Sequence, residues 1–469
     1  MKTKLLNLMV GLLAVLSVIF LTSGCDSDLV DINNSPNAVS EANVKTIVGQ
    51  QAVLVGLQAI IGDWYAGDRS RVTSVWTRQM CAPPGLGRAQ PGSWNTYSVT
   101  RGSGDVIDYT WRNGFYAVKL SNDIIDNAAD AGLTGTTLNT YLGVAKFYKA
   151  LVLGEHAALW GDIPIETRNT VTPFPVFVKQ SAAYTEVQKL LDEAISHFQA
   201  GTATDARDLN FQGNQAKWIA AAYSLKARYS MHTLNYANAV SAAAQGITAA
   251  GNTVNGIWTV ALTSEYSPWG HWAQTETGDP IRANKYYVDR LKSEPGDTRL
   301  NAFFQIKAGS GATQIVGYDI YGDLGGTGDE LVTTRAAALN KYRAYNASFP
   351  LISFEENLLI RAEAKARTGD NAGAIADLNV IRANAGLTAK TAANFASTAA
   401  LITEILKQKY LQLFLEGQAY HDMRRVNKTD GTPLFRAGIP YRYFYTQSEQ
   451  TTNPNVPTGE DLFTRNELW

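Results

Sequence analysis

The side chains that could carry out metal or acid–base chemistry in this chain lie far from one another in the sequence. There are five histidines: His156, His197, His232, His271 and His421. None of them forms an H-x-x-x-H or H-E-x-x-H pattern, the spacing with which one face of a helix binds a catalytic metal. The sequence therefore predicts no metal site built from histidine.

Other catalytic patterns are incomplete. Glu355 and Glu356 are adjacent on a predicted helix, so their carboxylates point in different directions. The glycine-rich stretch at 322–330 lacks the Lys-Ser/Thr that follows a phosphate-binding loop. A glycoside hydrolase needs two carboxylates about 5 to 9.5 Å apart across a cleft, and no such pair is evident. We predict that the protein is not an enzyme and uses no cofactor. A structural cation is left open, and a secreted helical hydrolase is the third-ranked alternative.

Aromatic residues are abundant instead. The chain has ten Trp and 22 Tyr, and segments 64–111 and 251–350 combine them with Gly, Pro and Asn. A sugar ring has an apolar face of C–H bonds and a rim of hydroxyls, which suits flat aromatic rings flanked by polar groups. One such contact buries roughly 50 to 80 Å², worth about 1 to 2 kcal/mol. These two segments are therefore the predicted ligand-binding excursions from a helical scaffold.

The predicted ligand contacts are loop residues outside any helical periodicity, together with polar partners near them. They are Trp94, Asn95, Tyr97, Arg78, Tyr266, Trp269 and Trp272. Four other tryptophans, Trp64, Trp76, Trp111 and Trp160, lie in or beside predicted helices and are expected to pack in the core. We expect alanine at Trp94, Trp269 and Trp272 to abolish ligand binding and to leave thermal unfolding nearly unchanged.

The N-terminus has the pattern of an export signal. Lys2 and Lys4 precede an almost wholly apolar run from Leu5 to Leu21, and Cys25 follows two small residues. Acyl chains on Cys25 would hold the protein at a membrane, because each buried CH₂ adds about 0.8 kcal/mol. An uncleaved transmembrane anchor is the alternative. Cys81 is the one other cysteine, so a lipidated Cys25 leaves no intramolecular disulfide.

Composition and charge fit a globular protein that does not bind nucleic acid. Hydrophobic residues make up 45% of the chain, and the formal net charge is −1 without a basic run. Binding to phosphate backbones depends on clustered Lys and Arg, so we predict no nucleic-acid partner. We divide the chain into a signal peptide (1–24), a lipidated flexible tether (25–43) and a single domain (44–469).

Most of that domain is predicted to be helical. The clearest pair of helices runs from Phe354 to Leu387, with a turn at Gly369-Asp370 and a stop at Gly386. Small residues at mid-helix positions let two helices approach closely, as in a tetratricopeptide hairpin. Three further hairpins are predicted at 43–65 with 111–128, at 138–161 with 181–198, and at 216–232 with 236–250. We therefore predict an all-α fold.

Four stretches in order resemble the SusD/RagB family of outer-membrane nutrient-binding lipoproteins. They are Cys25 with "DLVDINNSPNA", "YLGVAKFYKALVLGEHAALWGDIPI", "ENLLIRAEAKARTGDNAGAIADLNVIRANAGL" and "IPYRYFYTQSEQTTNPNVP". The resemblance implies tetratricopeptide-like hairpins that form a curved scaffold, with loops building the ligand face. It also implies that the acidic residues Asp26 and Asp28 after the lipidated cysteine accompany export to the cell surface.

The function implied by the resemblance is non-catalytic. A cell-surface lipoprotein would capture oligosaccharide or polysaccharide and deliver it to a TonB-dependent, SusC-like transporter in the outer membrane. The same architecture could instead bind peptides or protein fragments, since aromatic loops suit peptide side chains as well. The sequence does not identify the glycan or the stoichiometry with the transporter.

Overall fold

A computed structural model describes residues 41–82, 89–102, 105–165, 174–259, 265–275, 281–306, 314–320, 337–430 and 438–469. The predicted signal peptide, Cys25 and most of the tether lie outside these ranges. Within them, helices dominate and the strands are two to four residues long. No helix in the described ranges is both long enough and apolar enough to cross a membrane.

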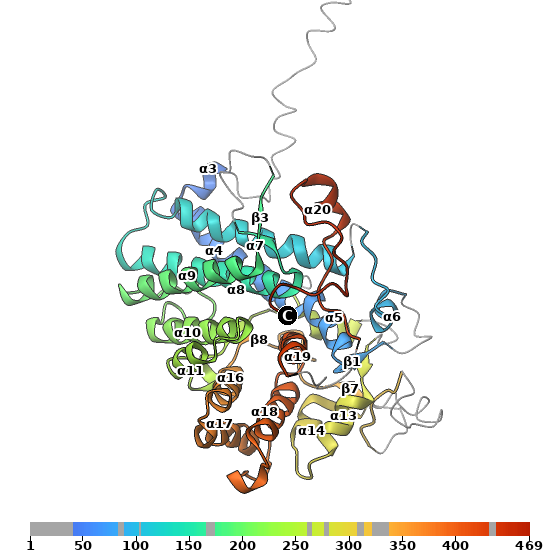
Figure 1. The fold of residues 1–469 in the computed structure, drawn as a ribbon. Helices are drawn as coiled ribbons and strands as arrows, with labels where there is room; N and C mark the ends of the chain where they lie inside the picture. Colours follow the sequence, from blue (N-terminus) through green and yellow to red (C-terminus); the bar gives the residue numbers. More distant parts are fainter. Residues whose placement is uncertain are drawn as a thin grey trace, which may run out of the picture.

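Pairs of helices form the scaffold. They are α4 (Ile47–Ala66) with α7 (Val106–Asn127), α8 (Gly135–Trp160) with α9 (Gln180–Gln199), α10 (Gln215–His232) with α11 (Tyr236–Ala244), and α16 (Phe354–Arg367) with α17 (Asn371–Asn384). Neighbouring pairs also touch one another, so the helices stack down the left side of Figure 1 and continue into α18 (Thr398–Gln412). The predicted helical fold and its hairpins are confirmed.

The pair α16 and α17 shows how the sequence sets this arrangement. The Asp370 side chain caps α17 by accepting a hydrogen bond from the Gly373 amide at 2.9 Å. Gly386 follows the end of α17 with a φ of 73°, a conformation that glycine adopts at no steric cost. Ala362 and Ala366 are buried between the helices. Their small side chains allow the close approach that the sequence predicted.

The remaining elements lie at the edges of this stack and on its other side. The helices are α3 (Glu41–Val44), α5 (Asp68–Trp76), α6 (Ala89–Asn95), α12 (Pro268–Thr275), α13 (Lys285–Lys292), α14 (Arg299–Phe303), α19 (Gln418–Thr429) and α20 (Gln447–Thr452), with 3-10 turns at Ala250–Asn252 and Ala392–Asn394. The strands are β1 (Met80–Cys81), β2 (Ile163–Pro164), β3 (Phe177–Val178), β4 (Val254–Gly256), β5 (Arg282–Ala283), β6 (Phe304–Ile306), β7 (Ala337–Leu339) and β8 (Phe349–Ile352). They form antiparallel pairs β1–β5, β2–β3, β4–β8 and β6–β7.

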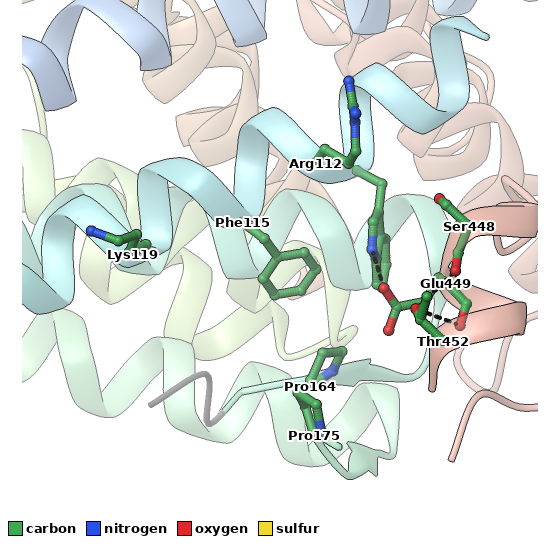
Figure 2. Close-up of a pocket in the computed structure, with 9 residues that line it drawn as sticks. Arg112, Phe115, Lys119, Pro164, Pro175, Ser448, Glu449 and Thr452 are labelled. Carbon is green, nitrogen blue, oxygen red and sulfur yellow. Dashed lines mark hydrogen bonds between the residues drawn. The ribbon is translucent and has the colours of Figure 1, made fainter. Parts of the chain in front are cut away.

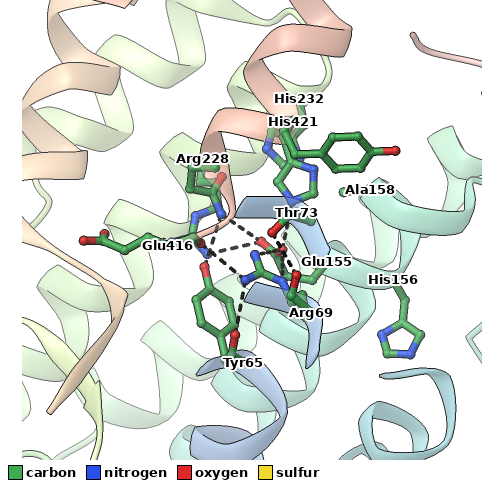
Figure 3. Close-up of polar contacts among 12 residues, drawn as sticks. Tyr65, Arg69, Thr73, Glu155, His156, Ala158, Arg228, His232, Glu416 and His421 are labelled. Atoms are coloured by element: carbon green, nitrogen blue, oxygen red, sulfur yellow. Dashed lines mark hydrogen bonds and ion pairs between the residues drawn. The ribbon is translucent and has the colours of Figure 1, made fainter. Parts of the chain in front are cut away.

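A buried carboxylate joins the two sides of the molecule (Figure 3). Glu155 of α8 is fully buried and accepts hydrogen bonds from Arg69 Nε of α5 at 3.1 Å and from His421 Nε2 of α19 at 3.0 Å. Its other oxygen accepts from Arg228 Nη1 of α10 at 3.4 Å. Burial alone would raise the pKa of Glu155, but Arg69, His421 and Arg228 hold that pKa well below its usual range.

The charges around Glu155 are themselves paired. Arg228 also binds both carboxylate oxygens of Glu356 at 2.6 Å. Arg424 Nη2 donates to His421 Nδ1 at 2.6 Å, which leaves the proton of a neutral imidazole on the nitrogen that faces Glu155. Burial lowers the pKa of His421 to about 4, in agreement with a neutral ring. The network is therefore a set of satisfied structural contacts.

We predict that Glu155→Gln lowers the free energy of unfolding by about 3 to 5 kcal/mol, because it leaves the buried guanidinium of Arg69 without its counter-charge. Urea denaturation followed by circular dichroism measures this loss. Glu186→Gln is the control, since Glu186 pairs with Lys189 at 3.3 Å near the surface and should cost less than about 1 kcal/mol. A similarly small loss for Glu155→Gln would mean that the network does not stabilise the fold.

Candidate ligand-binding site

The structure brings the two aromatic-rich segments together. Strand β1 from the first segment pairs antiparallel with β5 from the second, with Met80 opposite Ala283. Helix α6 carries Trp94, and helix α12 carries Trp269 and Trp272. Helix α6 of the first segment and α13 of the second lie on the right side of Figure 1, across the molecule from α9, α10 and α11.

Three of the predicted ligand contacts form a buried cluster. The side chains of Trp94, Trp269 and Trp272 are only 1%, 2% and 8% exposed. The ring centroid of Trp272 lies 6.2 Å from that of Trp94 and 5.7 Å from that of Trp269. These rings pack against one another, and a ligand has almost no ring surface to contact in this conformation. Their observed role is packing, and their role as ligand contacts stays a prediction.

Helix α5 supports this cluster from the scaffold side. Trp269 Nε1 donates to Ser70 Oγ at 3.1 Å. The guanidinium of Arg71 lies over the Trp272 ring, 4.0 Å from its centroid, at a distance where cation–π attraction is strong. The indole N–H of Trp94 has no hydrogen-bond partner within the described part of the chain.

Helix α12 is held against the chain that precedes β8. A Cβ atom added at Gly270 would lie 2.2 Å from the Ala344 carbonyl oxygen, so only glycine permits this approach. The Ser267 amide donates to the Tyr345 carbonyl at 2.7 Å. The sequence "SPWGHW" therefore places two tryptophans inward and His271 outward.

The polar candidates hold the loops of the first segment. Asn95 donates to the Ala82 carbonyl at 2.5 Å and accepts from the Ala82 amide at 3.1 Å. Arg78 is 4% exposed, and its guanidinium lies 5.5 Å from the centre of the Tyr286 ring. Tyr97 is half-buried with its ring edge-to-face against Trp76. These contacts give all three residues a structural role in the described conformation.

A pair of stacked tyrosines next to α12 is partly exposed to solvent. The rings of Tyr266 and Tyr345 stack with centroids 4.0 Å apart and an interplanar angle of 23°, and both residues are half-buried. His271 is exposed and lies perpendicular to Tyr266 at 6.2 Å. Gln274 is exposed on the same helix, and its side chain donates to the Arg343 carbonyl at 2.5 Å. Flat rings next to imidazole and amide groups are suited to a polyhydroxylated ligand.

Tyr345 was missed by the sequence reasoning, whereas Tyr266 was among the predicted contacts. The signal was present in "KYRAYNASF" (341–349), where two tyrosines sit in a segment with no helical periodicity. This segment lies inside the predicted second excursion, but its sequence pattern does not indicate that Tyr345 would stack on Tyr266. The stack depends on the register of α12 against residues 343–347.

The tryptophans expected in the core are there. Trp64, Trp76, Trp111 and Trp160 are between 0% and 4% exposed, which confirms those predictions.

Within the described ranges, no three His, Cys, Asp or Glu side chains are grouped so that they could hold a metal ion. Cys81 is a buried free thiol, and its burial raises its pKa well above the usual value. Such a thiol is a poor nucleophile.

The burial of Trp94 changes what its substitution should do. We now predict that Trp94→Ala lowers the free energy of unfolding by about 3 to 5 kcal/mol, the usual cost of deleting a buried indole. Differential scanning calorimetry measures this effect, with Phe463→Ala as the control because Phe463 is 49% exposed. Lost ligand binding with an unchanged melting temperature would instead support the sequence-based expectation.

The chain matches a known protein family in sequence and solved structures in fold. The sequence model of the SusD-like family described as starch-binding and associating with the outer membrane matches residues 88–437, more than half of the chain. No curated protein matches the chain by sequence. A SusD/RagB family protein from Bacteroides thetaiotaomicron superposes with a TM-score of 0.69 at 18% identity, covering 87% of this chain and 94% of that one. A chitin-binding SusD homologue from Flavobacterium johnsoniae gives 0.70 at 17% identity, covering 90% and 98%.

Proposed function

We propose that this chain, which belongs to the SusD-like family described as starch-binding and associating with the outer membrane, captures oligosaccharide at the cell surface. It then delivers the oligosaccharide to a TonB-dependent, SusC-like transporter. It is a binding protein and not an enzyme. The observation that carries glycan capture is the half-exposed stack of Tyr266 on Tyr345, with His271 and Gln274 beside it.

The proposed binding mode uses the stack as a platform for one sugar ring. The apolar C–H face would lie against a tyrosine ring, and its hydroxyls would bond to the imidazole of His271 and the amide of Gln274. Because α12 is fixed by the buried tryptophans, the platform is ordered before a ligand arrives, which reduces the entropic cost of binding. A few such contacts give weak affinity, which suits a protein that passes its ligand onward.

We expect isothermal titration calorimetry against a panel of glycans, starch and chitin fragments included, to detect binding that Tyr266→Ala weakens about tenfold or more. This corresponds to losing about 1 to 2 kcal/mol of aromatic contact. Tyr236→Ala is the control, because Tyr236 is a half-buried tyrosine on α11, outside both aromatic-rich segments. Binding of peptides with no binding of any glycan would refute glycan capture and favour the peptide-binding alternative.

Lipid attachment is the second part of the proposal. Cys25 follows the apolar run and small residues of the N-terminus. We predict that Cys25→Ser abolishes incorporation of labelled fatty acid and removes the protein from the membrane fraction. Cys81→Ser is a matched control that should do neither, since Cys81 is completely buried. Continued fatty-acid labelling of Cys25→Ser would contradict the assignment.

A further inference from the structure

A groove lies away from the tyrosine stack, between α7, the ends of β2 and β3, and α20 (Figure 2). Its volume is about 530 Å³. Phe115, Pro164 and Pro175 supply its apolar surface, and Arg112, Lys119 and Glu449 supply charged groups. The space is large enough for one or two sugar rings.

The aromatic surface of the groove is held rigidly. Phe115 is half-buried and lies edge-to-face against Trp111, with ring centroids 4.7 Å apart, and against His156 at 4.8 Å. Trp111 in turn stacks on Phe177, with an interplanar angle of 7°. These contacts fix the Phe115 ring before any ligand is bound, so binding would cost little side-chain entropy.

One rim of the groove carries a fixed acceptor. Glu449 Oε2 accepts from Trp111 Nε1 at 3.1 Å, and Glu449 Oε1 accepts from Asn453 Nδ2 at 3.1 Å. A carboxylate has about four acceptor positions, so the two oxygens can each accept a further bond. The protein therefore orients this carboxylate and leaves part of its hydrogen-bonding capacity for a ligand.

The α7 rim carries donors. The side chains of Arg112 and Lys119 are 55% and 57% exposed, and each is paired with a buried aspartate of its own helix. Arg112 Nε lies 3.4 Å from Asp108, and Lys119 Nζ lies 2.6 Å from Asp123. A guanidinium has five N–H donors and an ammonium has three, so both retain donors for a ligand while their charge is balanced.

We propose that this groove is a second carbohydrate-binding site, in which a neutral sugar ring stacks on Phe115 and its hydroxyls bond to Glu449 and to Lys119 or Arg112. The proposal rests on the glycan capture proposed above. Hydroxyl groups both donate and accept, so they match a rim with acceptors on one side and donors on the other. An anionic ligand would be repelled by the carboxylate of Glu449. The groove offers it little compensating positive charge, because Arg112 and Lys119 are already paired with aspartates.

An apolar peptide side chain fits the groove less well. It would fill the space beside Phe115 but would cover Glu449 and Lys119 without giving them hydrogen-bond partners, which is unfavourable for polar groups that lose water. Outside the lining of the groove, Tyr109 and Tyr116 of α7 are 42% and 51% exposed on the helical face that carries Arg112. The groove thus suits one unit of a longer glycan.

Two separate sites would change how the protein responds to chain length. A polymer that reaches both the tyrosine stack and the groove binds the second site as an intramolecular event, at a high effective concentration. A short oligosaccharide would occupy each site independently.

The test uses the mature protein labelled with 5-fluorotryptophan, because Trp111 borders the groove and reports on it by fluorine NMR. The Trp111 resonance is assigned by its loss in Trp111→Phe. The probes are glucose, maltose, maltoheptaose, N-acetylglucosamine, chitobiose, galactose and mannose. We expect at least one of them to shift the Trp111 resonance, with about tenfold weaker binding at this resonance in Phe115→Leu.

Two further variants complete the design. Glu449→Gln keeps the shape of the rim and should also weaken the binding reported by Trp111, while Tyr266→Ala should leave it intact. Phe115→Leu keeps an apolar side chain in place, and an unchanged melting temperature confirms that it folds. These variants separate loss of the groove site from loss of the tyrosine stack.

The outcomes are distinguishable from failure of the proposed function. Glycan binding by calorimetry with a Trp111 resonance that no sugar moves would overturn the groove site and leave glycan capture standing. A shift that is equal in wild type and in Phe115→Leu would overturn it as well. A Trp111 shift caused by the peptide Gly-Pro-Phe and by none of the sugars would identify the groove as a peptide site.

Discussion

The carboxylate of Glu155 is the contact on which the two sides of the molecule depend. It lies in the middle of the helical stack and binds side chains from α5, α10 and α19. A buried carboxylate that lost one of these partners would be destabilised by several kcal/mol. The hairpins and the loop-rich side are therefore stable only in one relative position.

Helix α5 transmits this constraint to the loop-rich side of the molecule through consecutive residues. Arg69 points inward to Glu155, Ser70 accepts the hydrogen bond of Trp269, and Arg71 covers the ring of Trp272. The tryptophans in turn fix α12 and with it Tyr266. The scaffold thus determines the position of the tyrosine stack, although the stack itself belongs to an irregular segment.

Sequence patterns were sufficient for the scaffold because long helices repeat their apolar spacing many times. The hairpin of α16 and α17 could be predicted down to its turn at Gly369-Asp370 and its stop at Gly386. Helices α6 and α12 are only seven and eight residues long, too short for periodicity to show which side of each helix faces inward. For that reason the sequence could predict the two aromatic-rich segments that contain Trp94 and Trp269. It could not predict that these two rings are buried. The groove was also beyond sequence reasoning, since its Trp111–Glu449 contact joins residues 338 positions apart.

The spacing of the partners of Glu155 along the chain has a consequence for folding. Arg69 is 86 residues before it and His421 is 266 residues after it. Contacts at such separation form late, because the loops between them must close first. The contacts that join the two sides of the molecule therefore cannot be completed until α19 has been synthesised.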